Sequence, residues 1–129
     1  MADGKSSFHP HARIVGDFIY VSGLIARLKD QQEIPGVVID GNGKVVSQDV
    51  VVQFRAIMLN LQNILKEADS NLCNVVDVTV FLTNIAGDFK KFNEVYGEYF
   101  DGILPCRTTV EVNQFPSPVS IEIKVIAIK

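Results

Sequence analysis

The chain has 129 residues, a formal net charge of −3 and 47% hydrophobic residues, which is the composition of one folded domain rather than of a disordered chain. The slight acidic excess argues against nonspecific binding to nucleic acid or to an anionic membrane, because a basic surface drives both. The opening segment MADGKSSFHPHAR lacks the apolar core of a secretory signal, and no apolar run reaches the length of a membrane span. Together with two cysteines in no metal or redox spacing, these features predict a cytoplasmic protein.

Two hairpins are predicted early in the chain. In ARIVGDFIYVSG (12–23), β-forming residues flank Gly16-Asp17, and the glycine supplies the positive φ that a tight hairpin turn needs. Short apolar runs at 37–39 and 45–46 flank the turn GNG, which predicts a second hairpin or an edge extension.

The spacing of apolar residues becomes helical between Asp49 and Ala68. Ser47 is the expected N-cap, and Asp49 suits the positive end of the helix dipole. The buried stripe is expected to comprise Val50, Phe54, Ile57, Leu61, Ile64 and Ala68. The opposite, solvated face is expected to carry Gln53, Asn60, Asn63 and Lys66.

Strand and helix signals alternate in the second half. The run VVDVTVFL (75–82) alternates, and a helix follows with Asp88 as its expected N-cap. Two further strands are predicted at about 107–112 and 120–128. The apolar side of the run 75–82 is expected to hold Val76, Val78, Val80 and Leu82. The aromatic stripe of the helix comprises Phe89, Phe92, Tyr96, Tyr99 and Phe100, which is expected to be core.

This order of elements predicts an α+β fold, with two helices packed on one face of a mixed sheet. The second face of the last strand is half polar and half apolar, with Glu122 and Lys124 followed by Ile126 and Ile128. Such a face is too apolar to lie in water, so a partner subunit is expected to cover it.

Arg107 and Glu122 are the candidate functional residues, because each places a charge inside a predicted strand. Both are expected to open onto the helix-free face. A guanidinium can bind a carboxylate bidentately, and a partly desolvated glutamate can move protons or orient water. The alternative is a cross-strand ion pair of structural use, and spacing alone leaves both interpretations open.

Three further features are weaker candidates. His9 and His11 could chelate a metal, but no third ligand is nearby, so no metal site is predicted. Cys106 beside Arg107 could have a lowered pKa or could be a packed thiol. The GNG stretch is a turn rather than a phosphate-binding loop, because no Lys-Ser/Thr follows it.

Four motifs together, YVSG, FNEVYGEYF, PCRTTVEV and IEIKVIA, resemble the reactive intermediate deaminase (Rid) family of enamine/imine deaminases, over nearly the whole chain. HPHAR, RTTVEVNQFPSP and the long segment 24–47 are similar to its 2-aminomuconate deaminase subgroup. The resemblance implies one domain (1–129) with a flexible N-terminal segment (1–11), in a chorismate-mutase-like sandwich. It also implies a homotrimer with a central barrel and active sites between subunits.

The resemblance also assigns roles to residues. It implies that Arg107 binds the substrate carboxylate and that Glu122 orients the attacking water. Tyrosine and cysteine stand at the positions of His9 and Thr109 in family members that act on 2-aminoacrylate, which argues against that substrate. The other residues implied to bind substrate are Ser22, Asn93, Thr108 through a nearby backbone amide, His9, and Arg27 (with Arg13 as its alternative) at a second carboxylate.

The implied reaction converts 2-aminomuconate to 4-oxalocrotonate and ammonia, with no metal or organic cofactor. Two alternative functions would use the same site. The protein could be a general deaminase of 2-aminoacrylate-type enamines, or a non-catalytic trimer that binds small carboxylates. Proteins of this broad family have also been described as ribonucleases or chaperones, and the net negative charge argues against RNA.

Overall fold

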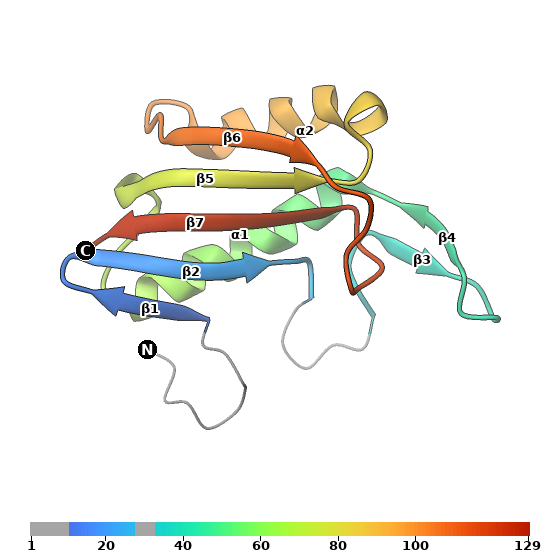
Figure 1. Ribbon diagram of the computed structural model, residues 1–129, viewed down its shortest axis with the longest axis horizontal. Helices are drawn as coiled ribbons and strands as arrows, with labels where there is room; N and C mark the ends of the chain where they lie inside the picture. The colour runs from blue at the N-terminus through green and yellow to red at the C-terminus, as the bar shows by residue number, and fades with distance from the viewer. Residues whose placement is uncertain (1–10, 28–32) are drawn as a thin grey trace.

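A five-stranded sheet forms the centre of the computed structural model, which describes residues 11–27 and 33–129. The strand order is β1-β2-β7-β5-β6 (Figure 1). Strands β5 and β6 are parallel and the other neighbours are antiparallel, so the sheet is mixed, as predicted. The five strands are β1 (Ala12–Val15), β2 (Phe18–Leu24), β5 (Val75–Leu82), β6 (Cys106–Glu111) and β7 (Ile121–Ile128).

Two helices, α1 (Val50–Glu67) and α2 (Ile85–Phe100), cover the same face of the sheet and lie behind it in Figure 1. The predicted α+β architecture is therefore confirmed. The second hairpin, β3 (Val37–Ile39) and β4 (Val45–Gln48), is a separate two-stranded sheet beyond one end of the main sheet. A short 3-10 helix (Leu72–Asn74) precedes β5. Of the helices in the described part of the chain, none has the length and apolar character to cross a bilayer.

The core lies between the helices and the sheet, and the predicted helix stripes supply it. Phe54 of α1 meets Phe92 of α2 edge to face, with ring centroids 5.2 Å apart. Tyr96 and Phe100 continue the aromatic contact along α2 at 4.7 Å. Val50, Phe54, Ile57 and Leu61 are fully buried, as their helical spacing predicted.

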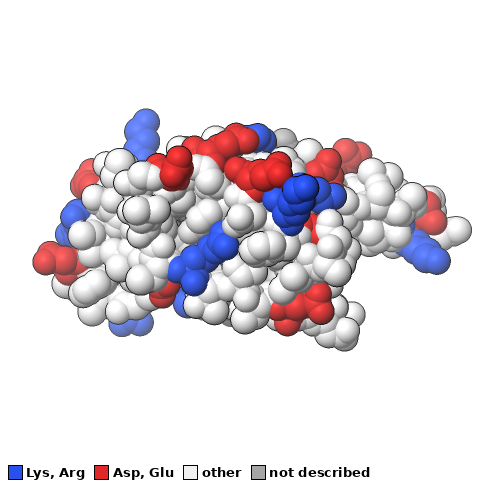
Figure 2. Space-filling model, turned by 90° about the horizontal axis from the view of Figure 1, so that it is seen from above, with Lys and Arg blue, Asp and Glu red and all other residues white. Residues whose placement is uncertain are grey.

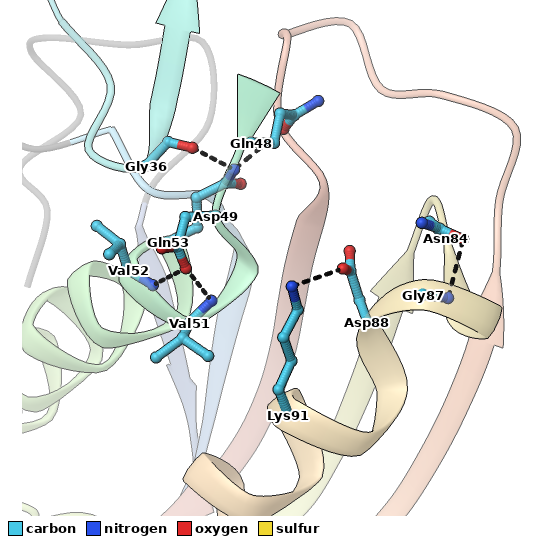
Figure 3. Close-up of polar contacts among 10 residues, drawn as sticks. All are labelled: Gly36, Gln48, Asp49, Val51, Val52, Gln53, Asn84, Gly87, Asp88 and Lys91. Carbon is cyan, nitrogen blue, oxygen red and sulfur yellow. Dashed lines mark hydrogen bonds and ion pairs between the residues drawn. The ribbon is translucent and has the colours of Figure 1, made fainter. Parts of the chain in front are cut away.

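Both predicted N-caps were wrong. Asp49 caps α1, and its carboxylate accepts hydrogen bonds from the backbone N–H groups of Val51 and Val52 at 3.0 and 3.1 Å (Figure 3). Ser47 is instead paired in β4. Asn84 caps α2, so this helix begins one turn before Asp88. In both helices a side chain nearer the true first turn reaches the free N–H groups.

Gln53 was predicted to be solvated and is instead fully buried. Its amide nitrogen donates to the carbonyl of Gly36 at 3.2 Å and to the side chain of Gln48 at 3.0 Å (Figure 3). Its amide oxygen accepts from the backbone N–H of Ser120 at 2.9 Å. The polar face of α1 is covered here because the β3–β4 hairpin and the start of β7 both pack against its first turn.

A change of register in β5 overturns the expected burial of Val76. The pairing of β5 with β7 shifts between Val75 and Asp77. Val75 is consequently 4% exposed and lies in the core, whereas Val76 is 40% exposed. The alternation expected for Val78, Val80 and Leu82 is confirmed, because all three are buried after the shift.

The helix-free face of the sheet is mixed in character, as predicted from the last strand. Phe18, Tyr20 and Ile128 are 46%, 41% and 37% exposed. Their pairing with one another across β2 and β7, together with half-buried Ile126, makes one continuous apolar area. Such an area on one side of a sheet is typical of a surface that another chain covers.

Candidate functional site

Arg107 lies in the edge strand β6 and points toward helix α2. Its Cα is aligned with that of Val78, which is fully buried on the helix side. The guanidinium donates a hydrogen bond from Nη1 to Asn93 Oδ1 at 2.8 Å. Its Cζ lies 4.6 Å from the centre of the Tyr96 ring, with the Phe89 ring at 5.7 Å. These contacts hold the cation in one orientation by hydrogen bonding and by cation–π attraction.

An open pocket of about 370 Å³ lies at Arg107 and is lined also by Ile85, Phe89 and Thr109. The Thr109 hydroxyl is buried and has no hydrogen-bond partner in the described part of the chain. The sequence indicated Thr109, because alternation places it on the same side of β6 as Arg107. It did not indicate Ile85, because the start of α2 was expected a turn later. The pocket offers one cation, one hydroxyl and apolar walls.

Glu122 lies in β7 on the helix-free side of the sheet. Its Cα is aligned with that of half-buried Phe81, between the core residues Ile121 and Ile123. Burial raises the pKa of the Glu122 carboxyl above its ordinary value. The raised pKa means that this group can hold a proton at higher pH than an exposed glutamate does.

The expectation that Arg107 and Glu122 share the helix-free face was wrong. They lie on opposite faces of the sheet, in strands β6 and β7 that are separated by β5. A cross-strand ion pair within one chain is excluded by the same register. Alternation within a strand predicts which residues share a side, but the face that each strand presents depends on pairing between strands.

Of two other expected substrate-binding residues, Asn93 lies near Arg107, whereas Ser22 lies in β2, the neighbour of β7. Asn93, on α2, holds Arg107. Ser22 lies in β2 where its pairing with β7 is irregular, and its backbone N–H donates to the carbonyl of His11 at 2.9 Å. Ser22 directly precedes Gly23, and the Glu122 carboxylate lies next to Gly23.

The other expected residues are not among those that line the Arg107 pocket. Thr108 is aligned with Thr79, so it faces the helix-free side and is exposed. The carbonyl of Arg27 accepts a hydrogen bond from Asn60 of α1 at 3.2 Å, which places this loop at the other helix. Arg13 is in β1, the opposite edge strand. His9 is outside the described residues.

Metal ligands among the described residues and basic side chains on the face drawn in Figure 2 bear on two other kinds of site. Within residues 11–27 and 33–129, no group of three or more His, Cys, Asp or Glu side chains could hold a metal ion. Figure 2 shows one face, on which Lys and Arg side chains form separate groups between acidic ones. A backbone-tracking nucleic-acid site normally needs a continuous basic surface, and this face has none.

Comparison with known proteins identifies the class. The family model described as Endoribonuclease L-PSP matches residues 5–129. A RutC family protein of Pyrococcus abyssi is 40% identical over 115 residues, which cover 89% of this chain and 81% of the relative. YyfA from Yersinia pestis, a member of the conserved Rid family, is 31% identical with a TM-score of 0.78, covering 99% of this chain and 90% of that one.

A second solved structure, Escherichia coli TdcF with bound serine, is 29% identical with a TM-score of 0.78 and covers 95% of this chain and 91% of that one. The two-helix, mixed-sheet fold is thus the fold of these structures. The chain belongs to the Endoribonuclease L-PSP family, whose members here include RutC and Rid proteins.

Proposed function

We propose that this protein is a hydrolytic deaminase of an enamine or imine that carries a carboxylate, and that it needs no cofactor. The observation that carries the proposal is the fixed guanidinium of Arg107 at an open pocket. One N–H group of the Arg107 guanidinium donates a hydrogen bond to Asn93, and its other N–H groups make no hydrogen bond with a described residue. Those donors match a carboxylate in geometry and charge. Serine, which TdcF binds, is a small carboxylate of the same kind.

The chemistry follows from the electrophilicity of the substrate. The enamine tautomerises to the imine, and water adds to the imine carbon. The resulting carbinolamine loses ammonia as its C–N bond breaks and leaves a ketone. Arg107 fixes the carbon beside the water, and Glu122 takes a proton from the water and returns one to the nitrogen. Burial raises the pKa of Glu122, which moves it in the direction of neutral pH, and a carboxyl acts better as both acid and base the nearer its pKa is to the working pH.

The active site is proposed to form between subunits of a homotrimer. Arg107 and Glu122 of one chain lie on opposite faces of its sheet. A Glu122 from a second copy can approach the Arg107 pocket, since the apolar area at Phe18 and Tyr20 on the Glu122 side is exposed and suited to contact with another subunit. The chorismate-mutase-like arrangement around a central barrel belongs to this proposal.

The substrate that we propose first is 2-aminomuconate, which yields 4-oxalocrotonate and ammonia in the cytoplasm. Its second carboxylate needs a second cation. Arg27 and Arg13 both lie away from β6 in one chain, so either would reach the pocket from a neighbouring subunit. A 2-aminoacrylate-type substrate needs Arg107 alone, and it is the competing candidate.

Ammonia release tests the proposal, with 2-aminomuconate generated in situ beside 2-aminoacrylate. Wild type is expected to turn over 2-aminomuconate faster, and Arg107→Ala and Glu122→Gln are expected to lose turnover. Arg55→Ala is the matched control, because Arg55 is an exposed arginine on α1 paired with Glu98. Preference for 2-aminoacrylate would overturn the proposal that 2-aminomuconate is the substrate. Binding of small carboxylates without turnover would indicate the non-catalytic trimer, and cleavage of RNA would indicate a ribonuclease.

Mixing the two inactive variants tests the shared site. If Arg107 and Glu122 come from different chains, co-refolded trimers of Arg107→Ala and Glu122→Gln regain about one quarter of the wild-type sites by random assembly. If both residues come from one chain, every site keeps a defect and mixing restores nothing.

A further inference from the structure

The pairing of β2 with β7 is interrupted beside Glu122. Val21 is aligned with Val125, and the next aligned pair is Leu24 with Ile123. Two residues of β2, Ser22 and Gly23, therefore oppose one residue of β7. This is a β-bulge, and bulges often occur beside active sites, where they redirect side chains.

A side chain at Gly23 would overlap the Glu122 carboxylate unless the carboxylate moved. A Cβ built on Gly23 would lie 2.6 Å from Glu122 Oε2 and 2.9 Å from Glu122 Cδ. Both distances are shorter than real Cβ contacts. The φ angle of Gly23 is outside the left-handed region, so its backbone conformation does not itself require glycine. The constraint is therefore the glutamate carboxylate.

Several titratable or charged side chains share the sheet face of Glu122. Lys124 is on the same strand. Asp77 of β5 is aligned with Ile126 of β7 on one side and with Cys106 of β6 on the other. Arg13 and Tyr20 are aligned with each other across β1 and β2. Burial is the cause of the raised pKa of Glu122, so its environment depends on how closely the carboxylate approaches neighbouring backbone.

We propose that the Ser22–Gly23 bulge holds the Glu122 carboxylate in position, and that Gly23 is a positioning residue for it. The absent side chain of Gly23 leaves the hollow in which the carboxylate lies against β2. Because this assigns a role to Gly23 in the deaminase site, it rests on the function proposed above. The contact between Gly23 and the Glu122 carboxylate is a property of the folded protein and can be tested without substrate.

Gly23→Ala is the direct test, with Gly41→Ala as its matched control. Gly41 also has a φ outside the left-handed region, but a Cβ there would meet nothing within 4 Å. The Glu122 carboxyl is titrated by ¹³C NMR in substrate-free protein. In Gly23→Ala the carboxylate is expected to move toward water and its pKa to fall toward the ordinary value for glutamate. Gly41→Ala is expected to leave it unchanged, and an unchanged pKa in Gly23→Ala overturns the proposal.

Kinetics supply a second readout. Displacing the carboxylate is expected to lower kcat about 100-fold, the effect of misplacing a catalytic group by about 1 Å. KM is expected to stay within about twofold, since Arg107 and its pocket are on the other face. A rise in KM with kcat unchanged would contradict the proposal. Absence of turnover in wild type would contradict the proposed function. The NMR titration would then decide by itself whether Gly23 positions the Glu122 carboxylate.

A double-mutant cycle decides the case in which Gly23→Ala folds poorly. In Glu122→Ala there is no carboxylate to displace, so adding Gly23→Ala is expected to change the unfolding midpoint no more than the Gly41→Ala control does. Equal loss in both backgrounds would mean that the added methyl group disturbs the backbone rather than Glu122, and it would overturn the proposal.

Discussion

Arg107 is held by the aromatic rings and Asn93 of α2, whereas Glu122 is held against the backbone of β2. The two surroundings have opposite effects on charge. A cation over an aromatic ring face is stabilised by the ring quadrupole. Within one chain the Glu122 carboxylate loses water without gaining a cation, which destabilises its charged form. One residue is therefore suited to bind and the other to exchange protons.

Replacing Glu122 by Gln should stabilise the fold at neutral pH. Burial raises the folded-state pKa of Glu122 above the ordinary 4.5. The folded state therefore binds this proton more tightly than the unfolded chain, and stability falls as pH rises from 4.5 through the raised pKa. Above that window Glu122→Gln should unfold at higher denaturant concentration than wild type, and the difference should vanish below pH 4.5.

Denaturant unfolding across this pH range measures the effect at a fixed protein concentration. Glu94→Gln, at an exposed position of α2, is the control for a change of net charge. A pH-independent difference between Glu122→Gln and wild type would show that the carboxyl is not the origin.

Removing Asn93 should weaken substrate binding rather than chemistry. Asn93→Ala leaves Arg107 without its hydrogen bond, and a bond to a charged group is worth about 1.5 kcal/mol, so KM should rise about tenfold. Asn63→Ala, on the exposed face of α1, is the control. Initial-rate kinetics would contradict this account if kcat fell and KM did not change.

Helix starts and strand ends are the features of single elements that position the site. Asn84 begins α2 and thereby brings Ile85 and Phe89 to the pocket. The N–H of Ile85 donates to the carboxylate of Glu111 at 2.9 Å, which joins the start of α2 to the end of β6. The position of Arg107 beneath α2 thus depends on both ends of this contact.

Asp49 rather than Ser47 should matter for the stability of α1. Asp49→Ala removes an acceptor for two backbone N–H groups and should cost about 1 kcal/mol of unfolding free energy. Ser47→Ala, at an exposed position in β4, should change it little. Urea unfolding of both variants measures the difference. A larger loss of unfolding free energy for Ser47→Ala than for Asp49→Ala would contradict the role of Asp49 as the N-cap.

Gln53 should be the polar residue of α1 that the fold tolerates losing least. Gln53→Leu keeps volume but leaves the N–H of Ser120 unpaired, while the carbonyl of Gly36 keeps its hydrogen bond from the N–H of Asp49. The change should cost about 1–3 kcal/mol. Gln62→Leu, at an exposed position of the same helix, is the control. Equal unfolding midpoints for the two variants would show that these buried hydrogen bonds carry no net stability.

Assembly is a property of the whole molecule, and the helix-free face is where we expect it. Tyr20→Lys places a charge within the apolar area of that face. It should convert the proposed trimer to monomers and abolish turnover, because burying an unpaired charge is costly. Leu59→Lys, at a 52% exposed position of α1, should leave the trimer intact.

Sedimentation and circular dichroism together check this expectation. A folded monomer of Tyr20→Lys supports the shared site. A trimer of Tyr20→Lys, or a monomeric wild type with full activity, would contradict it.

Local patterns of the sequence determined the elements and the fold class. Helical and alternating periods placed α1, α2 and the strands, because burial on one side imposes a period that the chain itself carries. Motif resemblance implied a substrate-binding role for Arg107 and for Asn93 separately, and the structure adds that the two side chains are hydrogen-bonded to each other. The cap of α1 was missed because two candidate side chains lie two residues apart, and only the path of the backbone selects one.

Tertiary structure decided what depends on register between strands. The bulge at Ser22–Gly23 and the shift at Val75 change which side chains face the core, and neither leaves a periodic signal. Gln53 is buried because segments distant in sequence cover it. Arg107 and Glu122 are on opposite faces for the same reason: alternation is a property of one strand, whereas the face it presents is set by its neighbours.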